Sequence, residues 1–157
     1  LKHERDPWVR RHKLKFDRVL VDAPCTGSGT WRRAPDAKWK LTEETIAELT
    51  ELQGRILESA ARLVKTGGRI VYATCSLLPE ENEARAEAFL ASHGSEFRRL
   101  DAREILPGDL AAALKLDGPD LALDPATHGT DGFYAVAFER IADPAPTEAV
   151  QAEVAGG

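Results

Sequence analysis

Two cysteines and one aspartate are the candidate catalytic residues of this sequence. Cys25 lies shortly after the apolar run 16–22, which ends in Asp22, and Cys75 directly follows the apolar run 68–74. A cysteine thiolate is a strong nucleophile, and a carboxylate can accept hydrogen bonds from a ligand. Such a set is suited to covalent catalysis on an electrophilic ring, with one thiol as the nucleophile, or to thiol–disulfide exchange.

Two strands and one helix must position these side chains. The runs 16–22 and 68–74 predict buried strands, and the helical periodicity from Thr42 to about Val64 connects them. A strand, a helix and a second strand in this order form a parallel unit, whose strand ends emerge at one edge of the sheet. We therefore expect both thiols and Asp22 to converge there.

Each of these residues also has a purely structural interpretation. A free cysteine such as Cys75 is often a small buried apolar side chain, and Asp22 can be satisfied by a loop amide. Gly27 and Gly29 follow Cys25, but Arg32 stands where a dinucleotide-binding loop would have its third glycine. The pair predicts a turn better than a phosphate loop.

The other elements follow from capping residues and periodicity. Thr42 is expected to cap the connecting helix, and Thr66-Gly67-Gly68 to end it. The remaining expected elements are, in chain order, a helix from Pro79 to Gly94, a strand at 96–100, an irregular segment at 101–127, a strand at 133–139 and a disordered tail at 141–157.

Length and composition indicate one globular domain. The chain has 157 residues, of which 43% are apolar and 30% charged, and no apolar stretch approaches the roughly 20 residues of a membrane helix. Two cysteines without C-x-x-C or Cys/His clustering argue against a zinc site and against a disulfide scaffold. We expect a soluble, cytoplasmic monomer that binds neither metal nor membrane.

Positive charge is concentrated in the first quarter of the chain. The net charge is −5, yet residues 1–40 carry eleven Lys or Arg against five Asp or Glu, whereas residues 41–157 carry ten against twenty-one. A basic quarter on an acidic domain indicates either a phosphate-facing surface or a solvated face without a partner.

Five stretches of the sequence resemble one known family. The segments 22–29 and 73–76, which contain the two cysteines, are similar to the RNA cytosine-5 methyltransferases of the rRNA small-subunit methyltransferase B and NOP2/Sun group. Three further segments, 32–39, 78–83 and 128–134, also resemble that family, in its order and spacing. The resemblance covers about residues 14–140 and implies the C-terminal half of a Rossmann-like α/β methyltransferase sheet, mostly parallel with an antiparallel strand near its end.

The resemblance also implies roles for individual residues. Cys75 would add to C6 of the target cytosine, so that C5 can take a methyl group from S-adenosylmethionine. Cys25 would assist release of the enzyme, and Asp22 would lie between the base and the cofactor and hold one or both. The two sulfurs are then expected to face each other across a cavity wide enough for a pyrimidine, which must be single-stranded or flipped out.

The family also implies an RNA substrate, rRNA rather than tRNA. Arg32, Arg33 and Lys38 are the candidates for phosphate contacts, whereas we expect Trp31 and Trp39 to pack in the core rather than stack on bases.

The family's glycine-rich cofactor loop lies upstream of the resembling segments. We therefore expect residues 1–140 to be a partial catalytic domain that alone binds S-adenosylmethionine poorly and turns over negligibly. Two alternatives stay open, namely a thiol redox protein that uses Cys25 and Cys75, and a non-catalytic RNA-binding fragment.

Overall fold

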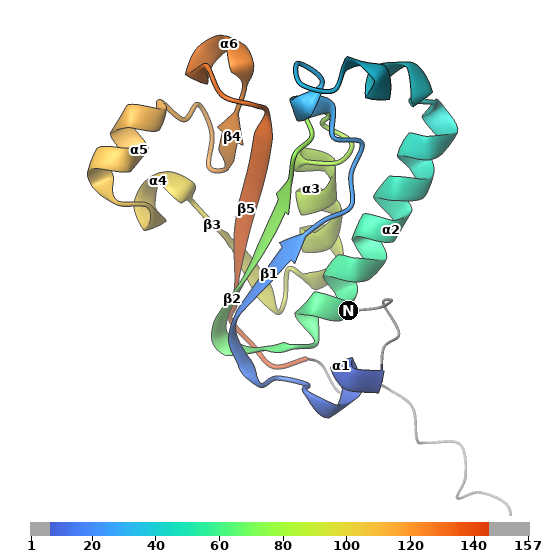
Figure 1. Ribbon diagram of the computed structural model, residues 1–157. Coiled ribbons are helices and arrows are strands. Elements are labelled where there is room, and N and C mark those ends of the chain that lie inside the picture. Colours follow the sequence, from blue (N-terminus) through green and yellow to red (C-terminus); the bar gives the residue numbers. More distant parts are fainter. Residues whose placement is uncertain (1–6, 145–157) are drawn as a thin grey trace, which may run out of the picture.

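The chain folds around one five-stranded sheet (Figure 1). The structure is a computed structural model and describes residues 7–144. Its strands are β1 (Phe16–Asp22), β2 (Val64–Thr74), β3 (Phe97–Leu100), β4 (Leu121–Leu123) and β5 (Phe133–Arg140).

The strand directions agree with the expected sheet. The order is β1-β2-β5-β3, and β4 also pairs with β5. β1 and β2 are parallel neighbours, with Asp22 opposite Ala73, whereas β5 pairs antiparallel with β2, β3 and β4. Four strands therefore share one direction and β5 alone runs against them in the described part of the chain. This confirms a mostly parallel α/β sheet with an antiparallel strand near the C-terminus.

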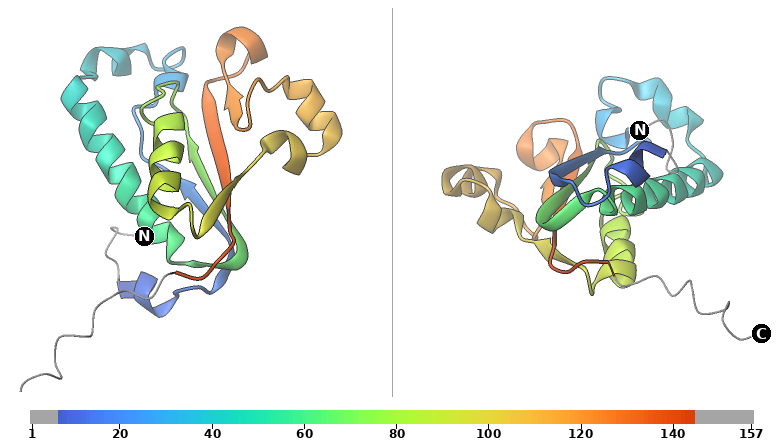
Figure 2. Two further views of the ribbon diagram at one scale, coloured as in Figure 1. Left: turned by 180° about the vertical axis from the view of Figure 1, so that it is seen from behind. Right: turned by 90° about the horizontal axis from the view of Figure 1, so that it is seen from below.

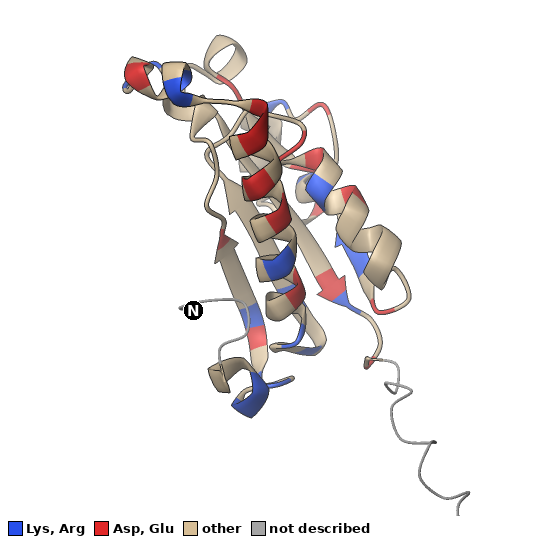
Figure 3. Ribbon diagram, turned by 90° about the vertical axis from the view of Figure 1, so that its right-hand side faces the viewer, with Lys and Arg blue, Asp and Glu red and all other residues tan. Residues whose placement is uncertain are grey.

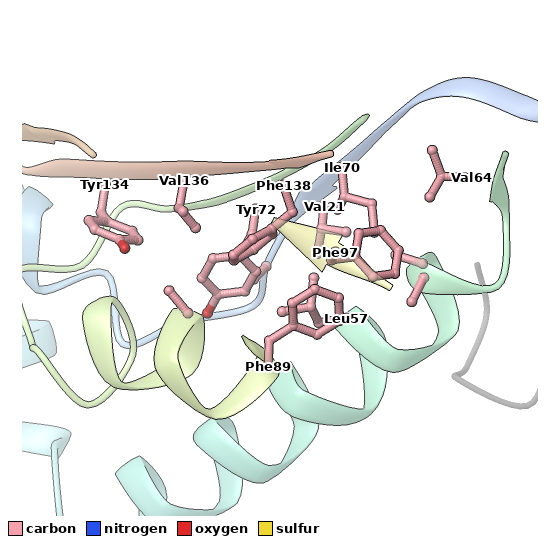
Figure 4. Close-up of a cluster of buried hydrophobic side chains, with 14 residues drawn as sticks. Val21, Leu57, Val64, Ile70, Tyr72, Phe89, Phe97, Tyr134, Val136 and Phe138 are labelled. Carbon is pink, nitrogen blue, oxygen red and sulfur yellow. The ribbon is translucent and has the colours of Figure 1, made fainter. Parts of the chain in front are cut away.

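Two helices cover one face of this sheet (Figure 2). They are α2 (Glu43–Ala61) and α3 (Glu83–His93). Thr42 caps α2 as predicted, because its hydroxyl oxygen accepts a hydrogen bond from the Thr45 backbone N–H. The core lies between this helix pair and the sheet (Figure 4). Its largest members are Val21, Leu57, Ile70, Tyr72, Phe89, Phe97, Tyr134, Val136 and Phe138.

The start of β2 differs from the prediction. α2 ends at Ala61, and Val64 already pairs with Phe16, so Thr66-Gly67-Gly68 does not end the helix. These residues form a bulge inside β2, where the register with β1 shifts and Gly67 has a left-handed φ of 78°. Glycine adopts that conformation without strain, which explains the residue type at this position.

The start of α3 is also later than predicted. Pro79 lies in a turn, where the Glu81 backbone N–H donates to the Leu78 carbonyl, and the helix begins at Glu83. The side chains of Glu81 and Asn82 are buried at this turn, so they serve the ends of β1 and β2 rather than the exposed first turn of a helix.

The segment 101–127 is not irregular, contrary to the prediction. It contains α4 (Ala102–Ile105), α5 (Gly108–Leu114), β4 and most of α6 (Pro125–His128). Aspartates cap two of these short helices: the Asp101 carboxylate accepts from the Arg103 N–H, and Asp124 accepts from Ala126 and Thr127. Such helices are too short to give a periodic pattern, so the sequence signal was confined to their caps.

The remaining segments lie at the two ends of the chain and after β1. A short helix, α1 (Pro7–Arg11), precedes β1, and two 3-10 helices, η1 (Ser28–Thr30) and η2 (Pro35–Lys40), follow it. Of the expected disordered tail, residues 145–157 lie outside the described residues.

Candidate active site

The two thiols meet at the edge of the sheet where β1 and β2 end. The parallel register continues past Asp22, because the Ala23 N–H donates to the Ala73 carbonyl at 2.9 Å. Cys75 follows Thr74 directly, and the Cys25 Sγ lies 3.4 Å from the Cys75 Sγ. Both cysteines are free and partly buried. The prediction that the sheet edge brings them together is confirmed.

The gap between the sulfurs is narrower than expected. A ring placed between them would need about 3.5–4 Å on each side, or roughly 7 Å in all. At 3.4 Å the two sulfurs are instead in hydrogen-bonding contact, so the expected cavity for a pyrimidine between them is wrong. A substrate can reach the pair only from its exposed side.

Burial sets the protonation state of Cys25. Partial burial, together with the hydrogen bond to Cys75, raises the pKa of the Cys25 thiol from 9.0 to about 11. Cys25 therefore holds its proton more tightly than an ordinary thiol, and its S–H can donate a hydrogen bond to the sulfur of Cys75.

A buried glutamate supports the loop that carries Cys25. Glu81 is fully buried, and its carboxylate accepts from the Thr26 N–H at 2.9 Å, from the Thr26 hydroxyl at 2.6 Å and from the Gln53 amide at 3.0 Å. The Tyr72 hydroxyl donates to the Glu81 backbone carbonyl at 2.7 Å, and burial raises the pKa of that phenol. Glu81 thus ties the Cys25 loop to α2.

Two serines and an asparagine fix the backbone after Cys75. The Ser28 and Ser76 hydroxyls lie 3.0 Å apart, and the Leu77 N–H donates to the Ser28 Oγ at 2.8 Å. The Asn82 side chain accepts from the Thr74 hydroxyl and donates to the Ser76 carbonyl. Sequence reasoning had assigned no role to Ser28, Ser76 or Asn82, and it had placed Glu81 in the first turn of a helix. All four lie in the segments 22–29, 73–76 and 78–83, but no local pattern showed which of their polar residues are buried.

The glycines near Cys25 allow two chain segments to touch. The Gly132 N–H donates to the Gly29 carbonyl at 2.9 Å, and the Gly29 N–H donates to the Cys75 carbonyl at 3.0 Å. A Cβ on Gly29 would lie 2.3 Å from the Gly132 carbonyl oxygen, which no side chain tolerates. Gly29 therefore serves close packing against the segment before β5, and Gly27, with φ of 67°, serves the turn.

Asp22 is exposed at the end of β1. Among residues 7–144 its carboxylate has neither a hydrogen bond nor an ion pair, so no loop amide satisfies it. A carboxylate without a partner in residues 7–144, at the end of the strand that leads to Cys25, is available to a ligand donor.

The basic candidates Arg32, Arg33 and Lys38 lie on the segment that follows Cys25. Arg33 Nε donates to the Asp131 carboxylate at 2.6 Å, and Arg32 Nη2 lies 3.6 Å from the other oxygen of Asp131. Lys38 is exposed and lies 5.7 Å from the ring centre of Trp39.

The two tryptophans of this segment, Trp31 and Trp39, differ in their exposure to solvent. Trp39 is 82% exposed, so the prediction that it packs in the core is wrong, whereas Trp31 is half-buried. Trp39 lies in the 3-10 helix η2, which protrudes from the sheet edge and offers no core to pack against.

A cavity of about 400 Å³ opens beside Ser76 and Leu77. One wall is formed by His128, whose Nδ1 accepts from the Asp124 N–H at 3.1 Å and whose Nε2 contacts the Leu114 carbonyl at 2.8 Å. The two contacts place the proton of the neutral ring on Nε2. His128 therefore clamps α6 to the end of α5, a role that the sequence did not reveal.

Two features of residues 7–144 concern membrane helices and metal sites. No helix within residues 7–144 combines the length and apolar character needed to cross a bilayer. In the same part of the chain, no three histidine, cysteine or acidic side chains converge as metal ligands would.

The mixed sheet and the helices that cover it form a Rossmann-like α/β fold of the kind found in methyltransferases. NSun6 from Pyrococcus horikoshii, solved with SFG, has this fold with a TM-score of 0.63 at 24% identity over 80% of this chain and 30% of its own. The protein PH0851 is also similar, with a TM-score of 0.74 and 38% identity over 87% of this chain and 29% of its own.

The family follows from the sequence comparison. The model of the 16S rRNA methyltransferase RsmB/F family matches residues 3–139, and the chain belongs to that family. The ribosomal RNA small subunit methyltransferase B of Sodalis glossinidius is 45% identical over 130 residues, which are 83% of this chain and 27% of that protein. The chain thus spans about a quarter of the length of this curated relative.

Proposed function

We propose that this chain is the C-terminal part of a longer enzyme that transfers a methyl group from S-adenosylmethionine to C5 of cytosine in RNA, with rRNA as the substrate. The observation that supports this most strongly is the contact between two free thiols, 3.4 Å apart, at the ends of two parallel strands. Family membership and the name of the Sodalis relative favour a ribosomal substrate.

Cys75 is the proposed nucleophile. Its thiolate forms a bond to C6 of the cytosine, the π bond between C5 and C6 breaks, and its electron pair becomes available at C5 while the σ bond remains. S-adenosylmethionine supplies an electrophilic methyl group when bound. After C5 loses its proton to a base, the bond between C6 and the sulfur breaks, and its electron pair returns to Cys75 as the thiolate.

Cys25 is proposed to assist the departure of Cys75. Because burial and its contact with Cys75 raise the pKa of Cys25 to about 11, the Cys25 sulfur keeps its proton at neutral pH. An S–H group 3.4 Å from the leaving sulfur can donate a hydrogen bond that stabilises the departing thiolate. Without this donor, the covalent adduct should persist.

Asp22 is the proposed contact to both base and cofactor. Its exposed carboxylate lacks a partner in residues 7–144, and it can accept from the exocyclic amine of cytosine or from the cofactor. The related NSun6 was solved with SFG, an analogue of S-adenosylmethionine. Because the described residues offer only this edge of a cofactor site, we propose that the 157-residue chain alone binds S-adenosylmethionine weakly.

The segment after Cys25 is proposed to contact the RNA. Arg32 and Lys38 are exposed and can approach phosphates, and Arg33 is held by Asp131 beside them. Trp39, at 82% exposure, offers a face on which an unpaired base can stack. A cytosine attacked at C6 must leave its own stack, which a stacking platform nearby would favour.

The test compares two single variants of the full-length enzyme. After incubation with RNA and cofactor, Cys25→Ala should accumulate a denaturation-resistant protein–RNA adduct on a gel, and Cys75→Ala should form none. An adduct with Cys75→Ala, or no adduct with either variant, would contradict the assignment.

A thiol redox protein is the second candidate, and the same sulfur contact favours it. A disulfide bond measures about 2.05 Å, so the two sulfurs need to approach by only about 1.4 Å. In that case oxidised glutathione would convert the two thiols to a disulfide and release two equivalents of reduced glutathione. Mass spectrometry across a glutathione redox series would show a reversible loss of two hydrogens at a physiological potential.

A non-catalytic RNA-binding module is the third interpretation, and it makes the opposite prediction for the thiols. RNA affinity and biological function would both survive Cys75→Ala. The catalytic proposal expects RNA affinity to survive and methylation to be lost.

A further inference from the structure

The basic residues of the first quarter divide into two groups at opposite ends of β1. Arg32, Arg33 and Lys38 follow the strand and lie at the thiol end. The second group lies in and just after α1, before β1 begins. Figure 3 shows the positively charged α1 at the far end of the molecule from the segment that follows Cys25. The fold thus creates a second basic surface that the sequence did not separate from the first.

This second surface is concave. A cavity of about 510 Å³ lies at the end of the sheet where β1 begins. Its charged and titratable lining residues are Arg10, Lys13, Glu58, Arg62, His93, Glu96 and Arg140. They come from the α1 segment, α2, α3, the start of β3 and the end of β5, so only the folded chain brings them together.

Both carboxylates of the cavity have a partner within the cavity. Glu96 pairs with Arg140 at 2.7 Å, and Glu58 lies 3.2 Å from the His93 Nε2. Arg140 is buried, and its other donors are taken by backbone carbonyls, including that of Val64. Arg140 therefore forms a fixed floor and is not available to a ligand.

Within the described residues, three cations of the cavity lie outside ion-pair distance of any carboxylate. Within residues 7–144, no carboxylate lies within ion-pair distance of Arg10, Lys13 or Arg62, and all three side chains are exposed. In addition, the His93 Nδ1 is buried without a hydrogen-bond partner in the described part of the chain. Uncompensated positive charge in a concavity attracts anions more strongly than the same charge on a flat face.

We propose that this cavity binds phosphate groups of the RNA backbone, as an anchoring site separate from the thiol edge. The proposal rests on the proposed function in one respect, namely that the polyanion is RNA. Phosphate contacts fix the position of a nucleic acid without selecting its sequence, which suits a site remote from the target base.

The dimensions of the sheet permit one RNA to reach both ends. β1 has seven residues, which at about 3.3 Å each span roughly 23 Å. A stacked strand rises about 3.4 Å per nucleotide, so about seven nucleotides cover this distance. The anchoring site would therefore engage RNA well outside the nucleotide that is methylated.

The test measures the salt dependence of RNA binding by fluorescence anisotropy, using this chain and a single-stranded RNA of about 20 nucleotides. The triple variant Arg10→Gln, Lys13→Gln, Arg62→Gln removes three phosphate contacts. For single strands the slope of log K against log[salt] changes by about 0.7 per contact, so its magnitude should fall by about 2. Circular dichroism would show that the variant remains folded.

A matched variant controls for the loss of net charge. Arg55→Gln, Arg98→Gln, Arg103→Gln also removes three positive charges, but each of these arginines already pairs with a carboxylate, from Glu51, Glu139 and Asp101 respectively. Its salt slope should stay close to that of the unmodified chain.

Two results would overturn the proposal. One is an equal change of slope in both triple variants. The other is an unchanged salt slope of RNA binding in the Arg10, Lys13 and Arg62 variant, although inorganic phosphate binds to the cavity and shifts the amide resonances near Arg10 and Arg62. The cavity would then bind a free anion and not the RNA. Neither result depends on methyl transfer, so the anchoring site can fail while the covalent adduct forms, and the reverse.

Discussion

The buried Glu81 gives the sharpest test of how the site is held together. Its carboxylate accepts three hydrogen bonds, two from Thr26 and one from Gln53, with no exposure to water. In Glu81→Ala the Thr26 N–H and hydroxyl lose their partner in a partly buried position, whereas the Gln53 amide keeps the Pro24 carbonyl. A hydrogen bond to a carboxylate contributes about 1.5–3 kcal/mol, so loss of the two Thr26 bonds should cost about 3–5 kcal/mol. For a chain of this length, that corresponds to a fall in Tm of about 10 °C.

The neighbouring Glu80 provides the control. It is exposed in the same segment, so Glu80→Ala should change the free energy of unfolding by less than about 0.5 kcal/mol. Glu81→Gln keeps the side-chain shape and one acceptor oxygen, and it should cost about 1 kcal/mol. Urea unfolding followed by circular dichroism measures all three. Equal stability of Glu81→Ala and Glu80→Ala would refute the claim that Glu81 secures the Cys25 loop.

Three further predictions concern packing, protonation and the cofactor. Gly29→Ala should destabilise the chain by roughly 1–3 kcal/mol or more, because its Cβ would meet the Gly132 carbonyl. Gly54→Ala in α2 has open space around it and should stabilise the chain by about 0.5–1 kcal/mol. Urea unfolding measures both variants, and equal effects would contradict the prediction. Because burial raises the pKa of Cys25 from 9.0 to about 11, the folded state binds a proton that the unfolded state has lost in that range. The free energy of unfolding should therefore fall as the pH rises from 9 to 11, and it should fall less in Cys25→Ser than in the unmodified chain. Urea unfolding across this pH range measures it, and an equal fall in both proteins would contradict the prediction. Calorimetry should detect no micromolar binding of S-adenosylmethionine to the 157-residue chain, and a micromolar Kd would refute the proposal that it holds only the edge of the cofactor site.

The parts of the site that depend on strand topology were predictable. Cys25 and Cys75 each follow an apolar run, and a helix lies between the runs, so the parallel rule places both thiols at one sheet edge. The Thr42 cap and the strand at 133–139 followed from equally local signals, and the antiparallel direction of that strand followed from the family resemblance. These features require only the direction of the chain and the identity of one or two residues.

The parts that depend on distances between side chains were not predictable. The sequence contains Glu80, Glu81 and Glu83 within four positions, and only the fold determines that Glu81 is buried while the other two face solvent. Trp39 was expected in the core because tryptophan is usually buried, but the protruding η2 leaves it exposed.

The distance between the two sulfurs was also not predictable from the sequence. Parallel strands bring two loops together, yet the 3.4 Å contact depends on how Gly29, Glu81 and Ser76 hold those loops. Arg10 and Lys13, which have no ion pair within residues 7–144, likewise acquire Arg62 as a neighbour only through folding.

The central claim is that the sulfur of Cys75 bonds to the target cytosine while Cys25 serves its release. Mass spectrometry of the nuclease- and protease-digested adduct from the full-length Cys25→Ala enzyme tests it most directly. We expect a methylated cytidine attached to the peptide that contains Cys75. A nucleotide attached to any other residue, or an unmodified Cys75 peptide in the isolated adduct, would contradict it.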